Sequence, residues 1–508
     1  MPKKYKAKND LVSYSVLSSS IAPFLDGDGG QTLRIGLAIV FMAVVGVAAY
    51  AMFGGAPGGG FVIAAAVIGA YMAMNIGAND VANTMGPPVG SGALTLIGAL
   101  TIAAVFEAAG AYLAGGDVVS TISKGIINPE NVEGTTTFIW LMMAALMSAA
   151  LWINLATWFG APVSTTHSIV GGVLGAGVAA AGVATVNWPT MGAIASSWVI
   201  SPLLGGVIAA AFLYFLRWAV LLREDKLEAA RRWVPVLVAI MAAAFAMYLA
   251  VKGLQRIWTP EIWMVWTLGA GALIGTYAIA RPMIARASEG LENRKRSVSQ
   301  LFTVPLIFSA ALLAFAHGAN DVANAIGPLA PIVSAVGQGG VQAQVTIPLW
   351  VMVIGGLGIG VGLMLFGPKL IRTVGKEITR LNQTRAFCVA LSAAITVIVA
   401  SGLGLPVSST HIAVGGVFGV GLLREWLANR SRPMPLFTWA EARATMTKEE
   451  WKALPKKDRK KIKKRNRRRL VRRRHLLTIV LAWLITVPAS AFLAAALFLA
   501  LISTFGQA

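Results

Sequence analysis

The chain has 508 residues, of which 56 % are hydrophobic and 13 % are charged. Soluble globular proteins carry about 25 % charged residues, so this composition excludes a soluble enzyme, a disordered regulator and a disulfide scaffold. It predicts a protein of the lipid bilayer. The net charge is +22, and the single cysteine, Cys388, excludes an intramolecular disulfide.

Apolar stretches long enough to cross a bilayer follow one another along the chain. A crossing helix needs about 20 apolar residues. Thirteen stretches meet this length approximately, near 33–53, 61–88, 97–114, 136–160, 161–186, 193–217, 235–252, 262–280, 301–330, 347–366, 386–404, 406–423 and 476–503. The first starts well after the basic N-terminal residues and has the length of a span, which predicts an uncleaved helix rather than a signal peptide. The stretch at 406–423 is short and also fits one arm of a re-entrant hairpin.

The basic residues predict the orientation in the membrane. If the N-terminus is cytoplasmic, 40 of the 43 Lys and Arg residues fall in cytoplasmic segments, and Lys124, Lys252 and Arg256 fall outside. The positive-inside rule therefore favours a chain integral to the cell membrane, inner or plasma, with a cytoplasmic N-terminus and an external C-terminus. The dense basic run at 456–474 is expected to lie beside anionic lipid heads, and it lacks the aromatic platform of a nucleic-acid site.

Two motifs occur twice in the same order. HGANDVANAIGP at 317–328 repeats IGANDVANTMGP at 76–87, 241 positions later, and GLPVSSTHIAVGGVFG at 404–419 repeats GAPVSTTHSIVGGVLG at 160–175, 244 positions later. Seven crossings separate the two copies of the first motif, and an odd number inverts the second copy. The sequence thus predicts an all-α polytopic membrane protein with about 12–13 transmembrane segments in two inverted-topology repeats, with broken or re-entrant helices at the centre, as in secondary transporters.

This duplication divides the chain into six expected segments. They are an N-terminus with an extra helix (1–60), transport repeat 1 (61–217), linking helices and loops (218–300), the first part of repeat 2 (301–423), a basic cytoplasmic loop (424–475) and the final helix of repeat 2 (476–508). The extra helix precedes the first repeat, and the basic loop interrupts the second.

The first motif places a carboxylate inside each repeat. An ionised Asp80 or Asp321 costs roughly 2.5 to 3.5 kcal/mol within a span, so each is expected to face a cavity with a cation or a hydrogen-bond donor. Neighbouring amides offer neutral oxygens that suit Na⁺. The predicted cation-binding residues are Asn79, Asp80, Asn83, Glu107, Asn320, Asp321 and Asn324. Glu107 lies in the third stretch and has no counterpart at the matching place in the second repeat.

The glycines and prolines of this motif are expected to make its backbone irregular. They are Gly77, Gly86, Pro87, Gly318, Gly327 and Pro328. Three histidines also lie in or beside the two motifs, His167, His317 and His411. Each is either a hydrogen-bonded core residue or part of a proton relay.

The second motif predicts an anion site. Pro162 and Pro406 interrupt apolar stretches, and hydroxyl residues then open a new helix, whose first N–H groups point outward and attract an anion. The predicted phosphate-binding residues are Asp80, Ser164, Thr165, Thr166, Asp321, Ser408, Ser409 and Thr410. A carboxylate accepts a hydrogen bond from a protonated oxyanion, so the aspartates would favour phosphate over sulfate.

These motifs resemble those of the PiT family of inorganic phosphate transporters. The resemblance rests on GANDVANTMGPPVGSGALT at 77–95, FEAAGAYLAG around Glu107, AHGANDVANAIGP at 316–328 and both PVS(S/T)TH elements. It implies phosphate uptake coupled to Na⁺, or to H⁺ in other members, without a covalent cofactor and often by a homodimer. This sequence departs from the family in its extra span at 33–53, in lacking a long loop after 281–300, and in the basic insertion within 424–475.

Other functions remain open at this point. They include an H⁺-coupled phosphate or metal–phosphate permease and a permease for another tetrahedral oxyanion such as sulfate. An intramembrane hydrolase using Ser164, His167 and an aspartate would need one active set, whereas this chain has two equivalent sets. An enzyme is therefore not predicted.

Overall fold

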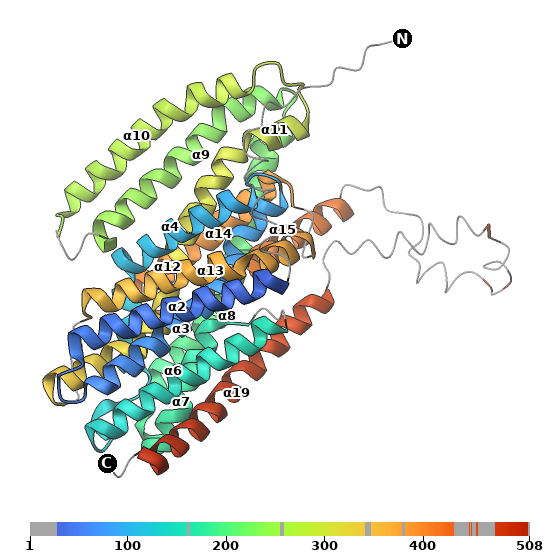
Figure 1. The fold of residues 1–508 in the computed structure, drawn as a ribbon. Helices are drawn as coiled ribbons and strands as arrows, with labels where there is room; N and C mark the ends of the chain where they lie inside the picture. Colours follow the sequence, from blue (N-terminus) through green and yellow to red (C-terminus); the bar gives the residue numbers. More distant parts are fainter. Residues whose placement is uncertain are drawn as a thin grey trace.

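The computed structural model describes residues 28–159, 163–253, 259–340, 347–377, 381–430 and 473–505, with isolated positions between 447 and 455. The described residues form a bundle of helices (Figure 1), and their only β-type pairing is an isolated bridge between Ile127 and Val186. The long helices are α2 (Asp28–Phe53), α3 (Gly59–Gly90), α4 (Leu96–Ala114), α6 (Thr135–Trp158), α7 (Thr165–Ala181), α8 (Trp188–Leu216), α9 (Lys226–Tyr248), α10 (Ile262–Ala287), α12 (Thr303–Gln338), α13 (Leu349–Glu377), α14 (Gln383–Gly402), α15 (Ser409–Arg430) and α19 (Arg473–Phe505). Shorter segments are α5 (Gly116–Ser120), α11 (Lys295–Leu301), the π-helical η1 (Thr121–Gly125), η4 (Arg217–Leu221) and η5 (Leu249–Gly253), and the 3₁₀ turns Pro129–Asn131 and Val183–Thr185.

Each of the thirteen predicted apolar stretches coincides with one long helix. Within the described chain, eleven helices have the length and composition to cross a membrane. The other two are α7, a shorter apolar helix, and α15, and both begin at the hydroxyl motif. The prediction of an all-α membrane protein is therefore confirmed.

The helical structure is interrupted at the second motif, as predicted from its prolines. α14 ends at Gly402, and the chain is non-helical through Pro406 until α15 begins at Ser409. Proline cannot donate a backbone hydrogen bond, so it disfavours continuation of the helix here. In the first repeat, Pro162 lies outside the described residues, and α7 begins at Thr165 with Ser164 as its N-cap.

The prediction of an irregular backbone in the first motif is wrong, because α3 and α12 run through it as continuous helices. The glycines serve close packing instead. A methyl group at Gly77 would collide with the carbonyl oxygen of Ile359 on α13, and one at Gly318 would collide with that of Glu107 on α4. Close approach of two helix backbones requires residues without a side chain at the contact.

The two repeats pack against each other reciprocally. α3 packs on α13 while α12 packs on α4, and α7 packs on α19 while α15 packs on α8. α3 and α12 run antiparallel: Gly69 contacts Leu329, whereas eleven residues further along α3 Asp80 faces His317. This direction fits the inverted duplication inferred from the sequence.

Polar contacts join the loops predicted to share a side of the membrane. Lys252 on η5 forms an ion pair of 2.6 Å with Asp117 on α5. At the opposite ends of the helices, Asn293 hydrogen-bonds the backbones of Glu224 and Lys226. α9 and α10 form a hairpin along one edge of the bundle, and α19 lies along the opposite edge (Figure 1). α15 extends into the segment assigned to the basic loop, and most of that loop lies outside the described residues.

Candidate functional site

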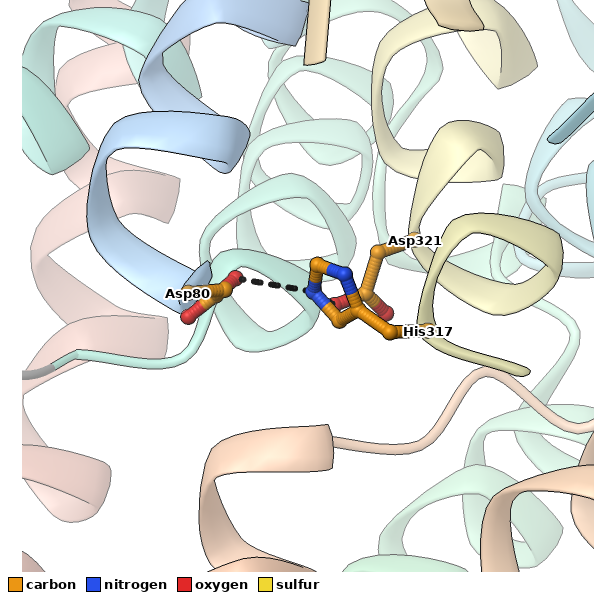
Figure 2. A group of neighbouring side chains, drawn as sticks. All are labelled: Asp80, His317 and Asp321. Carbon is orange, nitrogen blue, oxygen red and sulfur yellow. Dashed lines mark ion pairs between the residues drawn. The ribbon is translucent and has the colours of Figure 1, made fainter. Parts of the chain in front are cut away.

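The carboxylates of the two repeats meet inside the bundle. Asp80 on α3 and Asp321 on α12 are each 1 % exposed, and the imidazole of His317 lies between them (Figure 2). His317 Nε2 lies 2.8 Å from Asp321 Oδ2 and 3.8 Å from Asp80 Oδ2. The antiparallel packing of α3 and α12 brings together two residues separated by 241 positions.

Asp80 accepts hydrogen bonds from hydroxyls of both repeats. Thr165, at the start of α7, donates to Oδ2 at 2.9 Å, and Thr410, in the first turn of α15, donates to Oδ1 at 3.0 Å. Both hydroxyl residues are buried. The two helix starts therefore converge on one carboxylate.

Asp321 has a related environment. Ser409, the residue of α15 that matches Thr165, donates to its Oδ2 at 3.2 Å. The threonine before the histidine of each PVS(S/T)TH element accepts a hydrogen bond from an asparagine of the other repeat. Asn83 donates to Thr410 at 2.7 Å, and Asn324 donates to Thr166 at 3.3 Å. Each repeat thus supplies one amide to the other repeat and one hydroxyl that accepts from the other repeat's amide.

The remaining amides hydrogen-bond two hydroxyl residues that the sequence analysis did not single out. Asn79 donates to Thr157 on α6 at 2.8 Å, and Asn320 donates to Ser401 on α14 at 2.9 Å. Thr157 and Ser401 are 244 positions apart, the same offset as the second motif. That offset was a signal by which the sequence could have identified them.

Ser164 and Ser408 have a structural role within the motif. Their hydroxyls accept hydrogen bonds from the backbone N–H of His167 and of His411, at 3.1 and 3.4 Å, and so cap α7 and α15. The two imidazole rings contact each other with centroids 4.7 Å apart, and His167 also packs on Trp198.

Glu107 joins the centre through His317. Its Oε1 lies 3.2 Å from His317 Nδ1, and both side chains are fully buried. Gly318 on α12 packs on Glu107 of α4 in the same way as Gly77 on α3 packs on Ile359 of α13. In the pair α3–α13, Ile76 and Ile359 therefore occupy the places that His317 and Glu107 occupy in the pair α12–α4. The sequence analysis found no acidic counterpart to Glu107, and the structure places Ile359 there. For His317 the sequence analysis left two roles open, a core residue or part of a proton relay.

Several buried acceptor oxygens have no hydrogen-bond partner among the described residues. They are Asn79 Oδ1, Asn324 Oδ1, Asp321 Oδ1 and both carboxylate oxygens of Glu107. Buried polar atoms are almost always satisfied, so each of these oxygens is a candidate ligand for a cation. No lysine or arginine is among the buried polar residues in the part of the chain that the structure describes.

Comparisons with known proteins identify the family of the chain. The model of the Phosphate transporter family matches residues 76–494. A protein of Helicobacter pylori strain J99 named as a phosphate permease is 47 % identical over 510 residues, covering 93 % of this chain and 95 % of its own. One of Pyrococcus abyssi, named likewise, is 40 % identical over 70 % of this chain and 88 % of its own.

A solved structure is also similar. It is described as a sodium-dependent phosphate transporter, with a TM-score of 0.75 and 33 % identity, covering 87 % of this chain and 98 % of that chain. The buried motifs, the membrane-spanning bundle and these relatives lead to one conclusion: the chain belongs to the phosphate transporter family.

Proposed function

We propose that this membrane protein imports inorganic phosphate together with Na⁺, by alternating access between its two repeats. The observation that carries the proposal is the position of Asp80, which accepts hydrogen bonds from Thr165 of its own repeat and from Thr410 of the other. A site shared by two repeats can change its access when one repeat moves against the other. The name of the solved relative supports Na⁺ as the coupling ion.

The hydrogen bonds suggest how cation and anion binding depend on each other. A hydroxyl has one proton to donate, and those of Thr165, Ser409 and Thr410 are directed at carboxylates. Na⁺ bound to the aspartates and to the unpartnered oxygens of Asn79 and Asn324 would release these protons. The hydroxyls would then donate to phosphate, together with the first N–H groups of α7 and α15.

Energetics favour more than one cation for each phosphate. Importing a divalent anion against 100 mV costs about 4.6 kcal/mol before any concentration gradient, because each charge costs about 2.3 kcal/mol. Two or more Na⁺ ions offset this cost. The absence of buried lysine and arginine among the described residues is consistent with cations that arrive with the substrate.

Uptake of radiolabelled phosphate into proteoliposomes tests the proposal. Uptake should require an inwardly directed Na⁺ gradient. It should fall to background when choline replaces Na⁺, both at pH 6 and at pH 8. Uptake in choline that follows a pH gradient would instead indicate H⁺ coupling. Absence of phosphate uptake with every cation, from protein that is folded, would contradict the transport function itself.

A further inference from the structure

The non-helical segment between α14 and α15 is held largely by side chains of the other repeat. Each of its four successive carbonyl oxygens accepts a hydrogen bond from a side chain. The donors are Thr121 to Gly404 at 2.7 Å, Asn320 to Leu405 at 3.2 Å, Trp198 to Pro406 at 3.2 Å and Thr166 to Val407 at 3.0 Å. All of them except Asn320 belong to repeat 1. Residues 404–407 of repeat 2 are therefore fixed to repeat 1 at three points.

This segment lies against a side of the bundle that is predicted to be external. Thr121 begins η1 and follows α5, on which Asp117 forms its ion pair with Lys252. A methyl group on Gly404 would lie 3.4 Å from Thr121 Oγ1 and 3.6 Å from the carbonyl oxygen of Asp117. Residues 404–407 thus lie between η1 and the hydroxyl residues that open α15, so they cover the site from this side.

Two equivalent threonines have different partners. Thr410 donates to Asp80 Oδ1, whereas Thr166, its match in repeat 1, donates to the carbonyl of Val407. A hydroxyl has one proton to donate. Asp321 accepts from Ser409 at Oδ2, as Asp80 does from Thr165, but Asp321 Oδ1 is buried without a partner among the described residues. The donor missing there is the one that Thr166 directs at Val407.

We propose that residues 404–407 form the external gate of the transport site, that Thr121 and Trp198 hold it closed, and that Thr166 transfers its hydrogen bond from Val407 to Asp321 when the gate opens. By the symmetry of the repeats, Thr410 then leaves Asp80 for the carbonyl of Val163, which matches Val407. This gate rests on the proposed function, because it serves alternating access between inverted repeats.

The gate predicts different effects for different donors. The hydroxyl of Thr121 and the indole of Trp198 bind the gate only when it is closed, and the carbonyls that they leave then face water. Thr121→Val and Trp198→Phe should therefore each raise the ratio of open to closed protein about fivefold. Thr166→Val removes one hydrogen bond from each state, so it should leave this ratio unchanged while it reduces phosphate uptake.

Pulsed electron paramagnetic resonance measures this ratio. In a Cys388→Ser background, spin labels are attached at Glu133→Cys and Leu403→Cys; both positions are exposed, and Leu403 adjoins the gate. The full-length protein is measured in lipid nanodiscs without Na⁺ or phosphate. The double variant Thr121→Val/Trp198→Phe should shift the distribution of label distances toward longer values, with a ratio of long to short distances about 25-fold above that of the parent.

Matched controls remove the same groups elsewhere. Trp140→Phe loses an indole N–H that has no hydrogen-bond partner among the described residues, and Thr84→Val loses a hydroxyl that donates within its own helix. Both should keep the distances of the parent. If the double variant does not fold, Thr121→Val alone is measured, because Thr121 is only half-buried and valine keeps its shape.

Two results would overturn the proposal. An unchanged distribution in the gate variants contradicts the gate, and a shift in Thr166→Val as large as that in Thr121→Val contradicts the exchange of partners. Phosphate uptake driven by Na⁺ is measured on the wild type in parallel. Absent uptake together with the expected shift contradicts the proposed function alone, whereas uptake without the shift contradicts the gate alone.

Discussion

Thr410 donates a hydrogen bond of 3.0 Å to Asp80, although the two residues belong to different repeats. Asn83, one turn after Asp80 on α3, donates to the same hydroxyl at 2.7 Å. The carboxylate of one repeat is therefore held by the helix start of the other. Any movement of the repeats that separates these residues must replace this hydrogen bond with another partner for Asp80.

Removal of this hydroxyl should impair transport. Thr410→Val keeps the shape of the side chain but leaves Asp80 without one donor, at a cost of about 1–3 kcal/mol. We expect kcat/KM for phosphate uptake to fall about tenfold or more. Thr84→Val is the control, because Thr84 is buried on α3 but donates to the carbonyl of Val81 in its own helix; equal losses in the two variants would contradict a specific role of Thr410.

The charge of Asp80 should determine which oxyanion is accepted. Phosphate carries a proton at pH 7 and can donate a hydrogen bond to a carboxylate, whereas sulfate cannot. Asp80→Asn is therefore expected to retain some phosphate uptake and to gain sulfate uptake. Competition of unlabelled sulfate with labelled phosphate in proteoliposomes measures the change, and an unchanged phosphate-to-sulfate ratio would exclude this explanation of selectivity.

The glycines of the first motif should be intolerant of a methyl group. Gly77→Ala and Gly318→Ala each place a methyl against a backbone carbonyl of the facing helix, and overpacking typically costs about 1–3 kcal/mol. Both variants should have a lower thermal unfolding midpoint in detergent. Gly275→Ala on α10 should unfold at the temperature of the wild type or slightly above it, since nothing lies within 4 Å of a methyl group there and alanine favours a helix more than glycine does; similar losses in all three variants would contradict a specific role of the helix contacts.

The orientation of the chain can be tested with single cysteines. In a Cys388→Ser background, Glu133→Cys lies in a segment predicted to be external, and Glu289→Cys lies in one predicted to be cytoplasmic; both positions are exposed. An impermeant maleimide added to intact cells should label position 133 and not position 289. The opposite pattern would invert the predicted topology.

The sequence was sufficient to predict the transmembrane helices and to single out the two buried aspartates. Apolar stretches of span length became helices because the backbone must satisfy its own hydrogen bonds inside a bilayer, and Pro406 broke a helix where it was expected to. The duplicated motifs identified Asp80 and Asp321 because a buried carboxylate needs a partner. In contrast, the glycines near these aspartates were misread as breaks, since a sequence does not reveal whether glycine serves a bend or a close contact.

The tertiary structure decided which residues meet. Glu107 and His317 are 210 positions apart in the sequence, and they become neighbours because Gly318 lets α12 lie against α4. The pairing of Thr410 with Asp80, and of Asn79 with Thr157, likewise depends on how the helices of the bundle cross. Helix formation depends on local hydrophobicity and backbone hydrogen bonds, which the sequence displays, whereas contacts between helices depend on the shapes of distant surfaces, which exist only once the bundle has formed.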